Sequence, residues 1–403
     1  MFKNILKILI LILFSNSNES NAQKFPKSDI DEYINTTTLI KSKGYPCEEH
    51  DVLTKDGYIL SINRIPYSPN EVKKFSQKKI VLLQHGLLDA SSAWVINFPE
   101  QSLGFILSDA GYDVWLGNMR GNKYGLRHKH LKSNQSEFWD FSWSDMAKYD
   151  LTALIDYVLQ RTSQKDLIYV GHSQGTLIGL AEFGANLALA EKIKLFVALG
   201  PVSTVKHIKS PIRYIANMGT YSNQNVWFKL FGRRDFLPSS NKMNWLADKL
   251  CNLKVTDRIF CANLLFLLCG PSKYMNQSRI AVYFTHEPAG TSVKNLAHFG
   301  QAVISGKFQM YDYGPALNKQ RYNQSSPPLY DISKMHVPTA LYWAKNDWLA
   351  DPVDVEFIRN SLPKIVDDYE IMDWDHLDFL LATNAKECLY DRILKLIKKY
   401  AKI

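Results

Sequence analysis

A glycine-spaced serine is the strongest chemical signal in the sequence. Gly171-His172-Ser173-Gln174-Gly175 fits the pattern G-x-S-x-G, and it follows an apolar run and opens a small-residue helical pattern. A serine on a tight strand-to-helix turn takes a strained conformation, and side chains at 171 or 175 would collide with neighbouring elements. The hydroxyl is then held toward substrate beside a helix N-terminus, which favours developing negative charge. We interpret Ser173 as a nucleophile rather than an incidental turn residue.

A nucleophilic serine needs a base and a carboxylate, and in this motif's fold they follow in the order Ser, Asp or Glu, His. Of the ten histidines, only His376 lies after the last internal strand patterns, so it is the predicted base by elimination. Asp347 ends the stretch "TALYWAKND", in the loop that follows the predicted strand, and is the predicted carboxylate. Asp351 and Asp354 are nearby alternatives, although either could instead be a charge at a helix N-terminus.

The oxyanion formed during acyl transfer needs two preorganised N–H donors. One belongs to the residue after the nucleophile, which is Gln174, and the other to the loop after an early strand. The stretch "VLLQHGLLDAS" ends a strand at His85-Gly86, so the N–H of Leu87 is the natural second donor. Dinucleotide, P-loop and H-E-x-x-H metal patterns are missing from the sequence, so neither a cofactor nor a metal is expected.

Short apolar runs separated by helical patterns must position these residues. Runs of this kind indicate a parallel sheet covered on both faces. Residues 141–162 and the Lys-rich end near residues 389–400 have the helical period, and Asp56-Gly57 signals an antiparallel hairpin before the sheet. The predicted fold class is α/β, and its predicted strands are Ile80–Gln84, Tyr112–Leu116, Leu167–Val170, Leu195–Leu199, Thr339–Trp343 and Tyr369–Met372.

The strand rhythm divides the chain. We expect the α/β core in residues 23–200 and again in 327–403, with a helical cap inserted at 201–326, where the rhythm disappears. Within the cap, residues 226–246 mix large apolar side chains with basic ones, which is typical of an amphipathic lid. The alternative is ordinary cap core.

The N-terminus predicts export. Lys3 and Lys7 precede the apolar run Ile8–Phe14, and the segment ends in small and polar residues, so residues 1–22 form a predicted signal peptide cleaved after Ala22. A membrane span would need about 20 apolar residues, and no stretch is that long. Four glycosylation sequons support export, at Asn35, Asn134, Asn276 and Asn323.

Charge and cysteines narrow the function classes. The formal net charge of +9 suits an anionic surface. Nucleic acid is the least expected partner, because no dense Lys/Arg block is interleaved with aromatic residues. The five cysteines lack metal-ligand spacing, and close spacing favours a disulfide between Cys251 and Cys261. The alternative is that all five are reduced and buried.

The ordered motifs resemble those of the acid lipase family of α/β-hydrolases. The resemblance covers about residues 30–400 and rests on "GYPCEEHDVLTKDGYILSINRIP", "HGLLDASSAWV", "DVWLGNMRGNKYG", "FWDFSWSDMAKYDL", "GHSQGT", "HEPAGTSVKN", "NDWLADPVDV" and "HLDF". It implies an α/β-hydrolase fold with a cap and a movable lid, without a cofactor. It also implies a cap disulfide, which would join Cys251 to Cys261 here and leave Cys269 free.

The resemblance implies hydrolysis of neutral lipid esters, such as triacylglycerols or cholesteryl esters, at a lipid–water interface. By motif position it implies Ser173, His376 and Asp347 as the catalytic residues and the N–H groups of Leu87 and Gln174 as the oxyanion hole. We expect a secreted or lysosomal monomer. The alternative function is a catalytically inactive lipid carrier, which a degraded triad would mark, and here the triad residues are intact.

Overall fold

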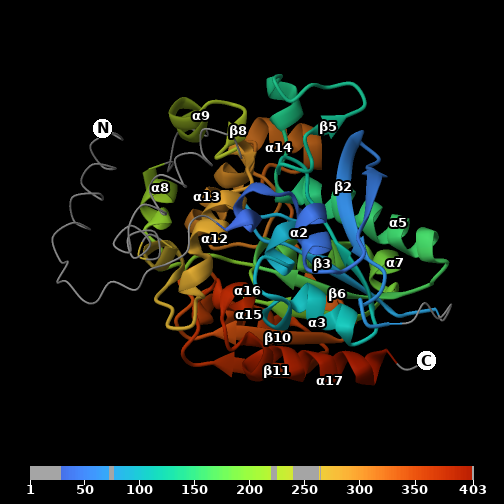
Figure 1. Ribbon diagram of the computed structural model, residues 1–403. Coiled ribbons are helices and arrows are strands. Elements are labelled where there is room, and N and C mark those ends of the chain that lie inside the picture. The colour runs from blue at the N-terminus through green and yellow to red at the C-terminus, as the bar shows by residue number, and fades with distance from the viewer. Residues whose placement is uncertain (1–28, 72–76, 219–224, 239–262, 264, 402–403) are drawn as a thin grey trace.

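The computed structural model describes residues 29–71, 77–218, 225–238, 263 and 265–401. Within these ranges the strands β1 to β7, β10 and β11 form one sheet in the order β1-β2-β4-β3-β6-β7-β10-β11, with β5 paired to β2 (Figure 1). Strand pairing is antiparallel from β1 to β4 and parallel from β4 to β11. The strands are β1 (Glu48–Leu53), β2 (Tyr58–Ile65), β3 (Ile80–Gln84), β4 (Asp113–Leu116), β5 (Arg127–His128), β6 (Leu167–His172), β7 (Ile193–Leu199), β10 (Thr339–Ala344) and β11 (Ile365–Ile371).

The α/β class and the antiparallel start are confirmed. Every residue of β3, β4 and β6 is buried, as continuous apolar strands in the middle of a covered parallel sheet should be. The predicted turn at Asp56-Gly57 joins β1 to β2 as a hairpin. Helices cover the sheet (Figure 1), namely α2 (Thr36–Ser42), α3 (Leu103–Asp109), α4 (Trp143–Asp145), α5 (Thr152–Thr162), α6 (Gln174–Ala185), α7 (Leu187–Ala190), α15 (Pro352–Ser361), α16 (Asp378–Leu381) and α17 (Asp391–Tyr400).

Two helical predictions need correction in detail. The helix expected over 141–162 is interrupted by a π-helical turn, Met146–Leu151, between α4 and α5. The last helix likewise begins with a π-helical turn, Lys386–Tyr390, before α17. In α17 the apolar side chains of Ile393 and Ile397 are buried while the lysines face outward, so this helix is amphipathic as predicted.

The described residues between β7 and β10 build a layer beside the sheet (Figure 1). Helix α13 packs against both α8 and α9, and β8 pairs antiparallel with β9, a small sheet that the sequence did not suggest. Trp227 of α9 is buried against Val293 and Ala297 of α13, so part of the expected amphipathic stretch is packed inside this layer. The elements are α8 (Ile212–Met218), α9 (Asn225–Phe231), β8 (Asp235–Phe236), α12 (Ile280–His286), β9 (Thr291–Ser292), α13 (Val293–Ser305) and α14 (Pro315–Tyr322).

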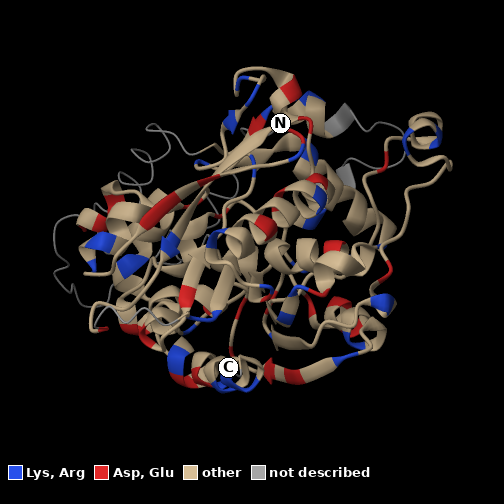
Figure 2. Cartoon of the chain, turned by 90° about the vertical axis from the view of Figure 1, so that its right-hand side faces the viewer, with Lys and Arg blue, Asp and Glu red and all other residues tan. Residues whose placement is uncertain are grey.

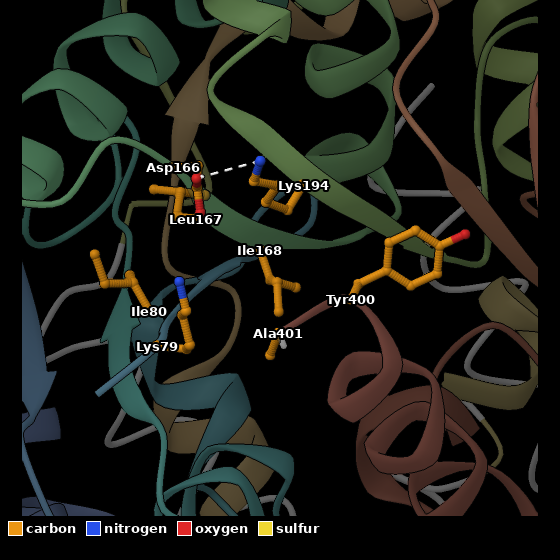
Figure 3. A pocket seen from close by; sticks show the side chains of 8 residues that line it. All are labelled: Lys79, Ile80, Asp166, Leu167, Ile168, Lys194, Tyr400 and Ala401. Atoms are coloured by element: carbon orange, nitrogen blue, oxygen red, sulfur yellow. Dashed lines mark ion pairs between the residues drawn. The ribbon is translucent and has the colours of Figure 1, made fainter. Parts of the chain in front are cut away.

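Charged residues of both signs are interspersed over the fold (Figure 2). A small pocket lies at the amino ends of β3 and β6, where Asp166 and Lys194 form an ion pair of 3.4 Å (Figure 3). Ser173 follows the opposite, carboxyl end of β6. This pocket is therefore not the place where the predicted catalytic residues meet.

Candidate active site

The carboxyl ends of four parallel strands bring the predicted site residues together. The strand registers pair Gln84 with Gly171 and Ala344 with Ile371, so these strands end at one edge of the sheet. The loops after β3, β6, β10 and β11 carry Leu87, Ser173, Asp347 and His376, respectively. Ligand sites of open α/β sheets form at this edge, because the loops there converge above the strand ends.

Ser173 stands on a strained turn between β6 and α6. Its backbone has φ of 52° and ψ of −118°, which a non-glycine residue adopts only when its surroundings force it. The glycines of the motif explain the force. A Cβ on Gly171 would lie 2.7 Å from the carbonyl carbon of Gly175, and a Cβ on Gly175 would lie 2.4 Å from the carbonyl oxygen of Gln84. The turn can therefore close only with glycine at both positions.

The three predicted catalytic side chains form a continuous relay. His376 Nε2 lies 2.7 Å from Ser173 Oγ, and His376 Nδ1 lies 2.7 Å from Asp347 Oδ2. The imidazole and the carboxylate are buried, whereas Ser173 is half-buried at the end of the relay. This geometry can move a proton from the serine hydroxyl to the imidazole while the carboxylate fixes the imidazole's orientation.

Asp347 and its two sequence alternatives have different surroundings. Asp347 Oδ1 accepts hydrogen bonds from two backbone N–H groups of the same loop, which leaves Oδ2 for the histidine. Asp351 caps the N-terminus of α15, the competing role that its position had suggested. Asp354 is bound to Thr204 and His207 and has no contact with His376. Of the three carboxylates, only Asp347 belongs to the relay.

The predicted oxyanion-hole residues lie beside the serine. Gln174 is the first residue of α6, so its N–H is one of the free donors of a helix N-terminus. On the other side, a Cβ on Gly86 would lie 3.1 Å from Ser173 Cβ, which shows how closely the loop after β3 approaches. Leu87 follows in that loop. His85 fixes the turn, since its Nδ1 donates to the Gly86 carbonyl and its Nε2 accepts from the N–H of Met119.

Two residues that sequence reasoning did not single out also position His376. His172 Nε2 donates to the backbone carbonyl of His376 over 2.9 Å, and burial lowers the pKa of His172 well below its ordinary value, so this ring is neutral. Gly200 has φ of 53°, and a Cβ there would lie 3.2 Å from the imidazole. His172 lies within the G-x-S-x-G motif, so the motif could have pointed to it. The role of Gly200 depends on how the loop after β7 packs, which the sequence pattern does not indicate.

A third residue missed from the sequence is Asn295 of α13. Its Nδ2 donates to Gln174 Oε1 over 2.8 Å, and its Oδ1 accepts from the N–H of Trp143 over 2.7 Å. Asn295 therefore ties the layer between β7 and β10 to the start of α6. It belongs to the stretch "TSVKN", which the sequence analysis used for the family resemblance without assigning it a role.

A buried carboxyl pair flanks His376. Asp375 Oδ1 accepts from the N–H of Leu377 and of Asp378, and Asp378 accepts from Ser272 and from the N–H of Asp375. Burial raises the pKa of Asp378 to about 6, and burial together with the neighbouring Asp378 raises the pKa of Asp375 well above its ordinary value. The pair retains a proton beside the relay in acid solution.

The remaining predicted positions are distributed as follows. Residues 1–22, together with Cys251 and Cys261, lie outside the described residues, whereas Cys47, Cys269 and Cys388 are free thiols. Asn35, Asn134 and Asn323 are exposed, but Asn276 is 9% exposed and donates to Gln101. Among the described residues, three or more His, Cys, Asp or Glu side chains do not gather in a way that could hold a metal ion. Each described helix is too short or too polar to span a membrane.

Comparisons with known proteins agree with the α/β-hydrolase fold that the sheet order indicates. Residues 79–383 match the alpha/beta hydrolase fold model, and residues 36–98 match the partial alpha/beta-hydrolase lipase region. Among solved structures, a putative lipase from Acinetobacter baumannii superposes with a TM-score of 0.54 at 14% identity, covering 93% of this chain and 98% of that one. At that identity the likeness concerns the fold alone.

Sequence relatives are much closer. The chain is 44% identical to human lysosomal acid lipase/cholesteryl ester hydrolase over 395 residues, which cover 98% of each protein. It is 46% identical to human gastric triacylglycerol lipase over 368 residues, which cover 91% of each. The chain therefore belongs to the acid lipase family of α/β-hydrolases and is a lipase acting on carboxylic esters.

Proposed function

We propose that this lipase hydrolyses neutral lipid esters, triacylglycerols or cholesteryl esters, through an acyl-enzyme on Ser173. The observation that carries the proposal is the relay from Ser173 Oγ through His376 to Asp347, with 2.7 Å at each step and with the serine on a strained turn. The names of the human relatives supply the two candidate substrate classes. A lipid carrier would not need these three groups in line.

In acylation, Ser173 Oγ attacks the ester carbonyl carbon while His376 Nε2 takes the hydroxyl proton. Negative charge develops on the carbonyl oxygen, which the N–H groups of Leu87 and Gln174 stabilise. The carbon–oxygen bond to the alcohol then breaks, and the leaving alkoxide receives the proton from His376. The acyl group stays on Ser173 and the alcohol departs.

Deacylation repeats the cycle with water. A water molecule attacks the acyl carbonyl carbon, and His376 accepts its proton. The bond to Ser173 Oγ breaks, Oγ recovers a proton from His376, and a fatty acid is released. Asp347 stays ionised and stabilises the imidazolium in both halves. Oxidants, cofactors and metals have no part in this balance.

The wider organisation is proposed along the same lines. Residues 1–22 would direct the chain into the secretory pathway, toward a secreted or lysosomal destination, as a monomer that acts at a lipid–water interface. The segment 201–326 would be the cap above the cleft, with core parts at 23–200 and 327–403, and Cys251 and Cys261 would form its disulfide. Exposed Asn35, Asn134 and Asn323 are the favoured glycosylation sites. Asn276 could be glycosylated only if its hydrogen bond to Gln101 were given up.

The test is hydrolysis of emulsified triolein and of cholesteryl oleate, from about pH 4 to 8, by the wild type and by Ser173→Ala. We expect oleate release that the variant loses, with residual rates lower by several orders of magnitude. The ratio of the two rates ranks the substrates. Folded wild-type protein that releases no oleate from either emulsion would contradict the proposal and favour the lipid-carrier function.

A further inference from the structure

The loop after β3 contains a second strained residue, directly after the proposed oxyanion donor. Leu88 has φ of 63°, in the left-handed region that non-glycine residues rarely adopt. Such a conformation costs about 1–2 kcal/mol and persists only where neighbouring groups hold it. The N–H of Leu87 depends on this loop, so whatever holds Leu88 also sets the oxyanion hole.

The groups that hold Leu88 come from the segment after α12. The N–H of Ala289 donates to the Leu88 carbonyl over 2.6 Å. The same segment is fixed from its other side, because the N–H of Lys123 donates to the Ala289 carbonyl over 2.9 Å. Asn122 Nδ2 donates to the Asp89 carbonyl over 3.3 Å. Residues 287–290 thus connect the oxyanion loop to the loop after β4.

A pair of acidic side chains lies at this connection. Asp89 is buried and Glu287 is half-buried, and their carboxyl groups are within hydrogen-bonding reach of each other. Glu287 Oε1 accepts a hydrogen bond from Ser92 Oγ over 3.3 Å. Glu287 Oε2 is buried, and within the described part of the chain it accepts no hydrogen bond from an N–H or hydroxyl group. Two carboxylates this close and this dry cannot both stay ionised, so one proton must lie between them.

We propose that the Asp89–Glu287 pair, joined by one shared proton, is a positioning element that holds the oxyanion loop, residues 86–89, in its catalytic conformation. The inference rests on the proposed role of the Leu87 N–H. Asp89 Oδ1 already accepts the N–H of Ala90 over 2.6 Å, so the proton lies on the Glu287 side. When that proton leaves, two adjacent anions repel each other and push the loop away from residues 287–290.

The charged groups around the pair set the direction of its pH dependence. Burial raises the pKa of Glu287 well above its ordinary value, and the charge of Asp89 raises it further. Lys123 opposes this with a nearby positive charge. His286, the preceding residue, is neutral, since burial lowers its pKa to about 3. A carboxyl whose pKa is raised on folding stabilises the fold at low pH, and that stability is lost as the pH rises from its ordinary pKa to the raised one.

The decisive variant is Glu287→Gln, because its amide N–H can donate to the Asp89 carboxyl group through a proton that does not leave as the pH rises. The measurement is kcat and KM on a soluble ester, p-nitrophenyl butyrate, across about pH 4 to 9. We expect the alkaline limb of the wild-type kcat profile to move to higher pH in Glu287→Gln, while the acid limb stays. The kcat of Glu287→Ala should be about tenfold lower than that of the wild type, with little change in KM. This loss is smaller than the roughly 10²–10³-fold fall in kcat that follows removal of an oxyanion-hole donor.

Two further variants separate this role from general stability. Asp89→Asn should also move the alkaline limb, because its amide donates to Glu287 in the reciprocal direction. Glu356→Gln, on the exposed face of α15, is the matched control and should leave the profile unchanged. Unfolding of each variant in a Ser173→Ala background reports stability alone.

The outcomes are distinct. Profiles of Glu287→Gln and Asp89→Asn that coincide with the wild type would overturn the inference, even if both variants melt at different temperatures. Wild-type hydrolysis that survives Ser173→Ala would instead contradict the proposed function. If Glu287→Ala does not fold, the comparison of the two amide variants still decides.

Discussion

The carboxyl edge of the sheet and the layer between β7 and β10 are held together in different ways. At the edge of the sheet the contacts are between main-chain atoms. Gly175 packs on the Gln84 carbonyl, and the registers of the parallel strands fix where each loop begins. In the other layer, side chains carry the packing, as where the ring of Trp227 would lie 2.9 Å from a Cβ on Gly300. Backbone contacts leave no room for adjustment, whereas side-chain packing can rearrange.

The difference bears on how the layer between β7 and β10 can act on the catalytic residues. The relay stands on the part that cannot adjust, and the layer beside it touches the relay through a few hydrogen bonds. Asn295 binds the Gln174 side chain, and Ala289 binds the Leu88 carbonyl. The first bond ends on a proposed oxyanion donor, Gln174, and the second ends on the residue next to the other donor, Leu87. Changes in this layer can therefore reach the chemistry through the oxyanion hole, besides the direct route through the Cys269 carbonyl, which accepts from the N–H of His376 over 3.5 Å.

The largest effect should come from the relay itself. Asp347→Asn would leave the shape of the loop but favour the wrong imidazole tautomer, so kcat should fall roughly 10⁴-fold. Its matched control is Asp351→Asn, which keeps an N-cap residue on α15 and loses only an ion pair with exposed Lys209. Steady-state kinetics on a soluble ester give both numbers. Equal losses in the two variants would mean that Asp347 does not orient His376.

A pair of glycine substitutions tests whether the edge is the stiffer region. Gly175→Ala should cost about 3 kcal/mol or more, the upper end for overpacking, because neither the turn nor the Gln84 carbonyl can move. Gly232→Ala, beside α9, should cost only about 1–2 kcal/mol, since its φ is 84° but the space around it is open. Denaturant unfolding measures both. Similar costs would remove the distinction drawn between the two regions.

The same distinction decides what could be predicted from sequence. Continuous apolar runs locate β3, β4, β6, β7 and β10, because central strands bury both faces. Strand β11 was expected to start at Tyr369 and starts at Ile365. Its first half carries Asp367 and Asp368, whose partners Arg392 and Arg359 come from α17 and α15. Because the charged side chains of this edge strand form ion pairs with arginines of other elements, its sequence lacks the apolar pattern that would predict a strand.

Within the site, the residues that could be predicted are those marked by a local sequence pattern or by their order along the chain. Ser173 and its glycines form one contiguous turn, and His376 could be reached by elimination, so both were identified from the sequence. Gly200, Asn295 and Glu287 act through contacts made only after folding, with partners at least 121 residues away in the sequence. Spacing does not encode such contacts, and the sequence analysis assigned these residues no role.

The smallest expected effect tests the bond that joins the two regions. Asn295→Ala removes the hydrogen bonds to Gln174 and to the N–H of Trp143, which should cost about 1–3 kcal/mol of stability. We also expect kcat on a soluble ester to fall severalfold with little change in KM, because Gln174 is no longer anchored where it supplies its N–H.

Gln301→Ala is the control for this link, because it lies on the same helix α13. Among the described residues, Gln301 binds the backbone of Asp312, with bonds of 2.9 Å to its N–H and its carbonyl, so both atoms lie within the layer between β7 and β10. A similar loss of stability with unchanged kcat would show that the layer acts on catalysis through Asn295. If both variants lower kcat equally, the link carries no specific effect, and the layer influences the edge only through overall stability.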